Sequence, residues 1–499
     1  MRPSIQLLGP ELIGRILREA FELLMNPGVR VGSAVVELLQ SAGVNVDDGV
    51  ARISEPLVRR CMASVPRDFY LYNRQGEKVV HYGGDDVHFD PGSCCVQMLD
   101  PETMEARQSE TRDLVRIVQV TETLPQFAAQ STAVVCNDAV VVNNDGNNAG
   151  NNDAPSAIGD LYRLFIVLQH SDKPVVTGSF SAAGLEGMID LLAADRGGLD
   201  KLRQQPRAVF DVCPSPPLNW SEFGSHNLLD LARAGVPAEI VSMPLAGGTA
   251  PVTLAGSVVQ HAAEVLAGVT LHQLAGPGSP IVWGGAPAIF DMRTGGAPMG
   301  AVETAMLNLA CAEVGKHLGL PTHGYLVATD SKFVDAQAGA ESARSAMLGA
   351  LAGINMISGA GMLESLACFS VEKLVIDAES IASAQRLTRG IEVRSDDVRS
   401  ESLATAMFAQ TGLSGEFLQL KETRALFRQE QYLPSSVIDR SARGSEPPAD
   451  VFTRARARVD ELVSKYQKPS LPEDVLRKFQ AIVSREAERA GVAAALPMN

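Results

Sequence analysis

The stretch AEIVSMPLAGGTAPVTLAGS, residues 238–257, joins an apolar, strand-like run to a turn almost without side chains and then to a helix-like segment. Gly247 and Gly248 allow backbone angles closed to other residues and let a bulky group approach the main chain. Thr249 suits the cap of the following helix, and Pro251 suits its first turn. Taken alone, the stretch also fits an ordinary strand-to-helix connection, so its meaning depends on whether the pattern repeats.

The pattern does repeat, because short runs rich in Val and Ile alternate with longer helix-like segments from about residue 130 onward. Eight runs follow it: TAVVCNDAVVV (132–142), PVVTGSF (174–180), AVFDVCP (208–214), AEIVSMPLAGG (238–248), SPIVWGGAP (279–287), THGYLVATD (322–330), INMISGAG (354–361) and KLVIDAE (373–379). Strand, crossover helix and parallel strand in such a series indicate a (β/α)8 TIM barrel of the α/β class. A doubly wound open sheet is the alternative, but no GxGxxG motif opens a first helix.

Three regions are predicted. Residues 1–125 mix helical periodicity with strand-like segments and are expected to form an N-terminal α+β cap. Residues 126–380 carry the barrel pattern and the catalytic site. Residues 381–499 are rich in Arg and Glu, contain amphipathic segments, and are expected to form a helical C-terminal extension. The polar loop NNDGNNAGNND, residues 143–153, is predicted to lie on the surface.

Composition and charge exclude several classes of protein. Of 499 residues, 45% are hydrophobic and 20% charged, which is typical of a folded enzyme. The net charge of −15 argues against binding to nucleic acid or to an anionic membrane surface. No secretory signal is apparent and no stretch is expected to reach the length of a membrane span. We therefore expect neither nucleic acid nor membrane as a partner.

The seven cysteines are scattered, odd in number and without a CxxC pair, which suits free thiols in a reducing cytoplasm. Cys94 and Cys95 are adjacent, but no histidine pattern completes a zinc site around them. The sequence therefore predicts a cytoplasmic protein without a bound metal.

Glycine recurs where the predicted strands end, which is the active-site face of such a barrel. The positions are Gly247, Gly248, Gly284, Gly285 and Gly359, with Ser358 beside the last. One glycine-rich turn is typical of an ordinary connection between two elements. Several such turns around one barrel mouth suggest a flat or bulky partner that contacts the backbone.

Polar residues crowd the segment ATDSKFVDAQAGAES, residues 328–342, directly after a predicted strand. An N-capping loop, with Asp335 or Ser331 as the cap, is one interpretation and is compatible with a functional one. His323 and Tyr325 alternate along the preceding strand, where such residues either fill the core or face the site. No nucleophile elbow, P-loop or HExxH motif occurs in the sequence.

Several long segments resemble the trimethylamine methyltransferase family in its broad form, which includes members without pyrrolysine. They are LDPETMEAR (99–107), SDKPVVTGSF (171–180), the segment from PLAGGTAP to IVWGG (244–285), TDSKFVDAQAGAES (329–342), GINMISGAGMLES (353–365) and FRQEQYLPSSVIDR (427–440). The resemblance covers most of the chain, and its central motif is long.

The resemblance implies a barrel that passes a methyl group from a methylated amine to the cobalt(I) of a corrinoid carried by a separate protein. No cofactor would then be held tightly by this chain, and a cobalamin on the partner would explain the glycine-rich mouth. The founding enzymes carry pyrrolysine, whereas every residue here is standard. A quaternary nitrogen carries a positive charge and therefore leaves as a neutral amine once the methyl group is transferred, without the help that a tertiary amine needs. For a member without pyrrolysine, the resemblance therefore implies a quaternary amine such as glycine betaine as the substrate. The alternatives are a barrel that binds the amine or the corrinoid protein without turnover, and a methyltransferase acting on trimethylamine.

Residue roles follow as expectations. Asp330 and Lys332 are the expected catalytic residues. The expected substrate-binding residues are Trp283, His323, Tyr325, Phe333, Gln337 and Asp377. The expected corrinoid-approach residues are Gly247, Gly248, Gly284, Gly285, Ser358 and Gly359.

One departure from the family pattern stands out, because GEFLQLKET has Glu416 and Glu422 where histidines are expected. A different substrate is one meaning of this change, and local packing of the C-terminal region is the other. The amphipathic tail helices also suggest a homo-oligomer.

Overall fold

The computed structural model describes residues 2–140, 158–180, 184–393, 403–442, 444 and 447–494. The loop predicted at residues 143–153 lies outside the described residues. Among those described, eight strands make up the two larger parallel sheets: β6 (His88–Pro91), β9 (Gln130–Ser131), β10 (Val175–Gly178), β11 (Ala208–Val212), β13 (Ala238–Ser242), β15 (Ile281–Gly285), β17 (His323–Tyr325) and β18 (Met356–Ala360). They form a five-stranded sheet, β15-β13-β11-β10-β9, and a three-stranded sheet, β17-β18-β6.

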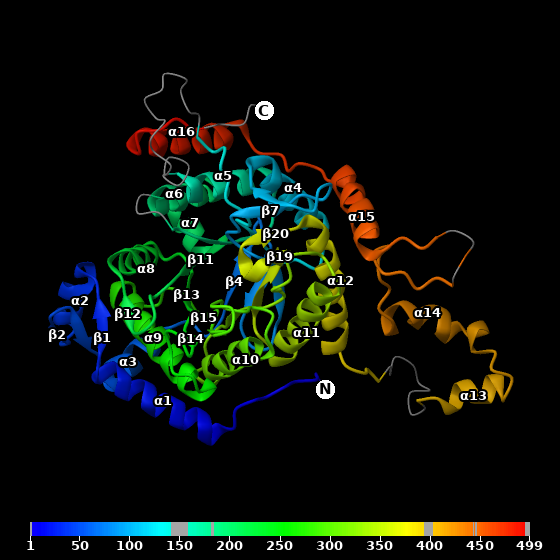
Figure 1. Cartoon of the computed structure of the whole chain (residues 1–499), viewed down its shortest axis with the longest axis horizontal. Coiled ribbons are helices and arrows are strands. Elements are labelled where there is room, and N and C mark those ends of the chain that lie inside the picture. The colour runs from blue at the N-terminus through cyan, green and yellow to red at the C-terminus, as the bar shows by residue number, and fades with distance from the viewer. Residues whose placement is uncertain are drawn as a thin grey trace.

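Helices alternate with these strands and cover them on the outside (Figure 1). They are α4 (Thr111–Thr123), α5 (Gly159–His170), α6 (Gly184–Arg196), α7 (Leu199–Gln204), α8 (Glu222–Ala234), α9 (Leu254–Ala275), α10 (Val302–His317), α11 (Ala336–Ala352) and α12 (Val371–Thr388). The prediction of an α/β fold built on parallel strands is confirmed. The strand pairs within these two sheets do not by themselves close a (β/α)8 ring.

One of the eight predicted strands is wrong. Residues 373–379 lie inside the helix α12, because Ser370 caps its N-terminus by accepting a hydrogen bond from the backbone N–H of Lys373. The eighth parallel strand is instead β6, which pairs with β18 and comes from the region assigned to the N-terminal cap. A four-residue strand before the barrel-like series carries no periodicity strong enough to reveal it.

The first strand run is shortened as well. Strand β9 ends just before the run predicted as a strand at 132–142, and the described part of that run, 132–140, holds only isolated bridges, Cys95 with Val134 and Val140 with Ala494. The other predicted strands and the helices between them agree with the structure.

A hairpin closes the space between the sheets at the end where the strands begin. Its strands are β4 (Phe69–Tyr72) and β5 (Lys78–Tyr82). Phe69 stacks on Tyr82 with ring centroids 4.9 Å apart, and both belong to an apolar cluster with Val176 and Met356 from the parallel strands. The hairpin thus fills the N-terminal end with apolar side chains and turns Tyr82 toward the interior.

The N-terminal region adds a smaller layer against α9. It contains α1 (Pro10–Met25), β1 (Val29–Val31), a 3-10 turn (Ser33–Val35), α2 (Val36–Ser41), β2 (Asn45–Asp47), β3 (Val50–Arg52) and α3 (Glu55–Met62), with β12 (Asn219–Trp220) completing the sheet β12-β1-β3-β2. Helix α9 is long and apolar enough to span a membrane, which corrects the expectation that no stretch reaches that length. It is mostly buried, packed among α1, α3, α8 and α10.

Short strands lie at the end of the molecule where the parallel strands finish. They are β7 (Gln97–Leu99), β8 (Ala106–Gln108), β14 (Leu245–Ala246), β16 (Ala288–Ile289), β19 (Met362–Leu363) and β20 (Cys368–Phe369), with a 3-10 turn at Glu364–Leu366. Most of them belong to the loops that follow the parallel strands, so they shape the face where the strands end.

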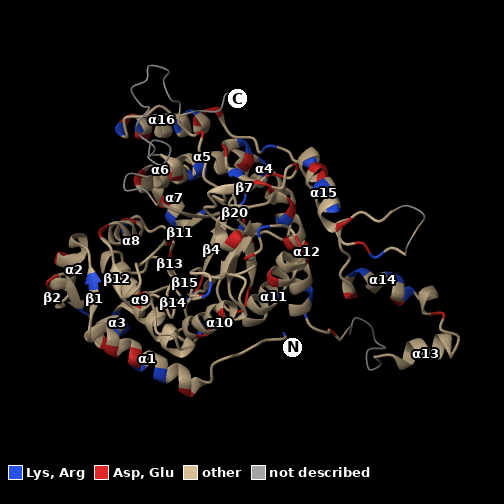
Figure 2. Cartoon of the chain, in the orientation of Figure 1, with Lys and Arg blue, Asp and Glu red and all other residues tan. Residues whose placement is uncertain are grey.

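The C-terminal region is helical, as predicted. It contains α13 (Thr405–Thr411), a 3-10 turn (Phe417–Gln419), α14 (Lys421–Glu430), α15 (Val451–Lys465) and α16 (Glu473–Arg489). Helices α15 and α16 lie against the body, and α13 and α14 form an arm that projects from it (Figure 1). Helices α1, α15 and α16 carry charges of both signs (Figure 2).

Candidate active site

Strand register decides which side chains face the interior. In a parallel pair, partnered residues point to the same side of the sheet. Asp211 is paired with Glu239, whereas Ile240 is paired with Trp283. The Trp283 indole N–H donates to the carbonyl of Cys311 on α10, at 2.9 Å, so the Ile240 and Trp283 side faces the helices. Asp211 and Glu239 therefore point into the space between the two sheets.

A buried polar group occupies that space, and we name it the interior cluster. Its members are Tyr82, Asp90, Asp211, Glu239, His323, Tyr325 and Ser358. Strands β6, β11, β13, β17, β18 and the hairpin strand β5 each supply at least one of them.

Contacts across the interior bind the two sheets together. The hydroxyl of Tyr325 donates to Asp211, at 2.8 Å. The Glu239 carboxyl contacts Nδ1 of His323, whose Nε2 lies 2.7 Å from the Ser358 hydroxyl. The rings of His323 and Tyr325 stack with centroids 5.2 Å apart and planes within 4°.

Proton positions follow from these partners. Ser358 donates its hydroxyl proton to Asp90, at 2.6 Å, so its oxygen accepts from Nε2–H of His323. Burial lowers the pKa of His323 to about 4, so the ring is neutral and turns the lone pair of Nδ1 to Glu239. One proton is therefore shared between Glu239 and Nδ1.

Three carboxyls in one interior hold protons strongly. Burial raises the pKa values of Asp90, Asp211 and Glu239 well above their usual range. The charge of Glu239 raises the pKa of Asp211 further. Such a set of acids is poised to exchange a proton for another cation.

The cluster is most accessible where the strands end. Asp90 and Glu239 are fully buried, whereas Asp211 is 6% exposed and Tyr325 8%. The Asp90 Oδ2 atom and the Tyr82 hydroxyl are buried without a hydrogen-bond partner among the described residues. A ligand that approached from the face with Asp211 and Tyr325 would thus meet both aromatic rings and carboxyl oxygens.

Two glycines leave room for the cluster. A Cβ atom on Gly284 would lie 2.0 Å from the Glu239 carboxyl, so any side chain there would displace it. A Cβ atom on Gly178 would lie 2.9 Å from the ring of Phe180 and 3.4 Å from Cβ of Asp211. Phe180 is 48% exposed, so its ring lies between Asp211 and solvent.

The structure places only some of the predicted substrate-binding residues in the interior cluster. His323 and Tyr325 belong to the interior cluster. Trp283 is buried against the helices, and Asp377 is buried on α12, where it pairs with Lys373 at 2.5 Å. The placement of Asp377 at a strand end is wrong, because that segment is helical, and its side chain accepts instead from the backbone N–H of Gly361, at 2.8 Å.

The polar loop at 328–342 lies on the face where the strands end, outside the interior cluster. Asp330 accepts from the backbone N–H groups of Met299, at 2.7 Å, and Gly300, at 3.1 Å, so it joins two loops. Asp335 caps α11 by accepting from the N–H of Ala338, which confirms the capping interpretation.

The side chains of three other residues in that loop point to the surface. Lys332 is 71% exposed and lies 3.8 Å from Glu364, and Phe333 is 49% exposed. Gln337 donates to Glu341, at 3.1 Å. The catalytic roles expected for Asp330 and Lys332 stay predictions.

The opening stretch forms strand β13, the short strand β14, a turn and helix α9. Gly247 has φ +89°, a backbone angle that favours glycine, and the hydroxyl of Thr249 accepts from the N–H of Leu245, at 3.0 Å. Helix α9 begins at Leu254 with Thr253 at the N-cap position, so the expectation that Thr249 caps it is wrong.

The remaining glycines have a packing reason. A Cβ atom on Gly285 would lie 2.2 Å from Nε2 of His261, and one on Gly359 would lie 1.9 Å from the carbonyl oxygen of Leu326. Gly247 and Gly248 stay in the exposed turn. The role of these glycines in the approach of a corrinoid stays a prediction.

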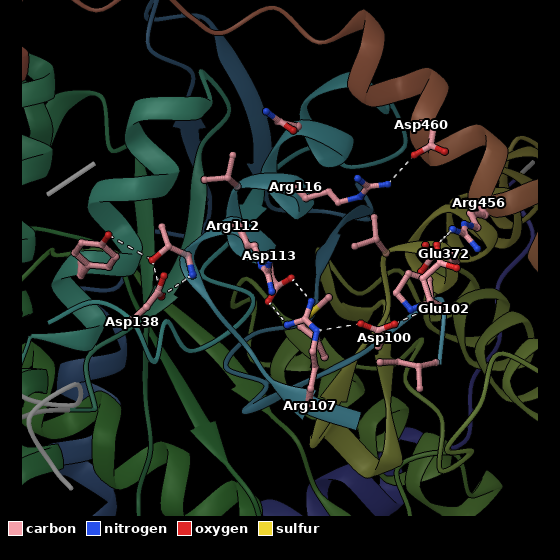
Figure 3. Close-up of a pocket in the computed structure, with 18 residues that line it drawn as sticks. Asp100, Glu102, Arg107, Arg112, Asp113, Arg116, Asp138, Glu372, Arg456 and Asp460 are labelled. Carbon is pink, nitrogen blue, oxygen red and sulfur yellow. Dashed lines mark hydrogen bonds and ion pairs between the residues drawn. The ribbon is translucent and has the colours of Figure 1, made fainter. Parts of the chain in front are cut away.

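A groove with a volume of about 990 Å3 lies elsewhere, on the outer side between α4, α12 and α15 (Figure 3). Arg107 donates to Asp100 and Asp113 there, Arg116 to Asp460, and Arg456 to Glu102. These pairs tie α15 to the LDPETMEAR segment. The arginines Arg107, Arg116 and Arg456 thus have carboxylate partners within the groove.

Sequence reasoning missed Tyr82, Asp90, Glu239 and Phe180. Asp211 falls within the predicted strand run AVFDVCP, which by itself indicates no role for it. A usable signal was present for Glu239, since it is the one acid inside the otherwise apolar run AEIVSMPL. A charged residue in a strand buried on both faces needs a partner or a function.

A family model described as trimethylamine methyltransferase (MTTB) matches residues 1–491. The chain belongs to the trimethylamine methyltransferase family. It is 32% identical to a trimethylamine methyltransferase of Methanosarcina mazei over 94% of this chain and 92% of that protein. It is 30% identical to one of Desulfitobacterium hafniense over 95% of this chain and 92% of that protein.

A glycine betaine methyltransferase of Desulfitobacterium hafniense is 27% identical over 98% of both chains. The crystal structure of the monomethylamine methyltransferase of Methanosarcina barkeri is 10% identical, with a TM-score of 0.48, over 98% of this chain and 89% of that one. As a member of the trimethylamine methyltransferase family, this chain is an enzyme of the methyltransferase class.

Proposed function

We propose that this enzyme moves a methyl group from a quaternary amine to the cobalt(I) of a corrinoid carried by a partner protein. The observation that carries the proposal is the interior cluster, in which three buried carboxyls and two aromatic rings lie together with no cationic side chain among the described residues. Carboxylates and the faces of aromatic rings are the groups that recognise ammonium ions.

The reaction needs positioning more than proton transfer. The bond between the methyl carbon and nitrogen breaks, its electron pair stays on nitrogen, and a neutral tertiary amine leaves. Cobalt(I) supplies the electron pair of the new bond and becomes methylcobalt(III). Within this chain, Asp211, Glu239 and the rings of His323 and Tyr325 hold the cation, and the walls of the interior exclude water.

We propose that the two sheets act as one (β/α)8 ring. A parallel bridge between Trp283 and Thr322 supports the join of β15 and β17. On the other side, the N–H of Ala128 donates to the carbonyl of Phe89, at 2.9 Å, beside β9 and β6. Such a ring would present all the strand ends, and with them the cluster, at one face.

That face is also where we propose that the corrinoid protein docks. Large apolar side chains are exposed there, in loops or helix starts that follow the parallel strands: Phe180, Met243, Val252, Met292, Val302, Met306 and Phe333. Val252 and Met292 both lie beside Gly247, so part of this surface is continuous. A protein that brings a corrin ring to the cluster would cover these side chains.

We further propose that the chain forms a homo-oligomer through the arm. Leu403, Leu413 and Leu418 are 74%, 101% and 83% exposed, and no residue of α13 or α14 is buried. Glu416 and Glu422 lie on this arm, away from the interior cluster within one chain. The buried and half-buried free thiols fit a cytoplasmic setting.

The test is spectroscopic. The protein is mixed with cobalamin held as cobalt(I), with and without its corrinoid protein, and quaternary amines and trimethylamine are added one at a time. Conversion to methylcobalt(III) with a quaternary amine is expected. Conversion with trimethylamine alone would reassign the substrate, and no conversion under any condition would favour a barrel that binds without turnover.

A further inference from the structure

The charges around the interior cluster are of one sign. Asp90, Asp211 and Glu239 come from three different strands, and the largest charge effects on them come from one another and from His323. Among the described residues, no lysine or arginine forms an ion pair with any of the three. A ligand inside the cluster is therefore surrounded by acids.

The cationic side chains near this face are engaged elsewhere. Lys373 is buried, but it points to Asp377 and to the hydroxyl of Ser342, at 2.9 Å. Arg163 is buried against Asp160 and the carbonyl of Thr132. Lys332 is on the surface. The sequence positions 141–157 and 181–183, which the structure does not describe, contain no Lys or Arg.

Three hydrogen-bond donors in the cluster are also already used, and the Tyr82 hydroxyl is the exception. Ser358 donates to Asp90, Tyr325 donates to Asp211, and Nε2–H of His323 donates to Ser358. A carboxylate placed here would meet the oxygens of Asp90, Asp211 and Glu239, which repel it whenever they are ionised. An ammonium ion would face the same oxygens as favourable partners.

We propose that this interior selects methylated ammonium ions with a net positive charge, such as choline and tetramethylammonium, over betaines whose carboxylate lies a few atoms from the nitrogen. The inference rests on the proposed function and narrows its substrate class. It replaces glycine betaine, the example expected from the sequence, by ions of similar shape without the anionic end. His323 is not an anchor for a carboxylate, because both of its nitrogens are engaged.

The experiment compares ligands that differ in charge and little in shape. Glycine betaine is zwitterionic, whereas its amide is a cation of nearly the same size. Choline has a neutral isostere, 3,3-dimethylbutanol, in which carbon replaces nitrogen. Binding to the purified protein is measured by calorimetry without any corrinoid, and methyl transfer to cobalt(I) is measured separately.

We expect the amide to bind about 100-fold more tightly than glycine betaine, and choline to bind more tightly than its neutral isostere. In the variant Asp211→Asn the preference for the amide should shrink, because one like charge facing the carboxylate is gone. Circular dichroism and thermal melting establish that the variant is folded.

The outcomes separate the two proposals. Binding and methyl transfer with glycine betaine at least as good as with its amide would overturn the charge selection and leave the methyltransferase function standing. Tight binding of cations without methyl transfer, with the corrinoid protein present, would overturn the function and leave the charge selection. Absence of binding by every cation would overturn the charge selection, whatever the methyl-transfer assay gives.

Discussion

The two ends of strand β11 differ in whether a buried ionisable side chain has a counter-ion. Arg207, just before the strand, pairs with Asp195 of α6, which also accepts from Arg74 at 2.9 Å. Asp211, near the other end, has a tyrosine hydroxyl and a second acid as neighbours and no cationic side chain among the described residues. A buried charge that has its counter-ion supports the fold, whereas a buried acid without one keeps a proton or awaits a cation.

The difference follows the usual division of labour in such folds. The face where parallel strands begin contributes stability, and the face where they end carries the chemistry. Here the first face is closed by the β4–β5 hairpin and the Arg207–Asp195 pair. The second face opens on Asp211, Tyr325 and Phe180. Changes to the two ends should therefore have different consequences.

The largest expected effect is at the stability end. Asp195→Ala leaves Arg207 buried without its counter-ion and removes one of the two carboxylate partners of Arg74, and we expect it to lower the free energy of unfolding by about 3–5 kcal/mol. Urea denaturation measures this loss. Asp200→Ala is the matched control, since Asp200 pairs with Arg203 at the surface and its side chain is 90% exposed. We expect a change of at most about 1 kcal/mol there. Equal losses in both variants would contradict the comparison.

At the other end, Asp211→Asn should impair function and not stability. We expect kcat/KM for a quaternary ammonium ion to fall about 30-fold or more, because one charge that faces the cation is lost. The folded protein without substrate should become more stable at pH 8, since an amide needs no proton to be neutral when buried. Steady-state kinetics and thermal melting at pH 8 test both halves. A loss of stability would mean that Asp211, like Asp195, stabilises the fold.

The pH dependence of stability has a definite sign. Burial raises the pKa values of Asp90, Asp211 and Glu239, so the folded state binds more protons than the unfolded state above the ordinary carboxyl pKa. The stability that these protons give is present at low pH and is lost as pH rises toward the raised pKa values. His323 opposes this trend between its lowered pKa of about 4 and the ordinary histidine pKa of 6.5, because the unfolded state binds the additional proton there.

Binding of a cation should have the opposite pH dependence. An ammonium ion favours ionised carboxylates, so its entry displaces a proton and its affinity should rise with pH. The groups that face the ligand are the three acids, His323, Tyr325 and Tyr82, and burial raises the pKa values of both tyrosines. Calorimetry in buffers of different ionisation enthalpy measures the proton release. Affinity that is constant between pH 6 and 9 would mean that the acids are ionised before binding.

The sequence predicted much of the fold because each βα unit carries its own local signal. Six of the Val- and Ile-rich runs became strands, since burial on both faces demands continuous apolar residues. KLVIDAE became part of α12 because its caps and its contacts with α11 outweigh β propensity. β6 was missed because four residues, HFDP, carry little periodicity.

The site was predicted less well, because it depends on which residues meet across the interior. His323 and Tyr325 were found by their alternation along one strand. Asp90 and Glu239 approach them from distant parts of the chain, and no spacing in the sequence records that meeting. Trp283 shows the converse error, since an aromatic at a strand end can face either the interior or the helices. Register, one residue either way, decides between them.

The smallest expected effect concerns Phe180, which lies between Asp211 and solvent. If its ring contacts the bound cation, Phe180→Ala should weaken binding of choline by about 0.5–1 kcal/mol, or roughly two- to fivefold. Phe180→Leu retains apolar contact but loses the π-face, so it should weaken choline and leave the neutral isostere 3,3-dimethylbutanol unchanged. Calorimetry with both ligands separates the two contributions. An equal loss for both ligands would make Phe180 an apolar cover over the charged end of β11, with no part in recognising the cation.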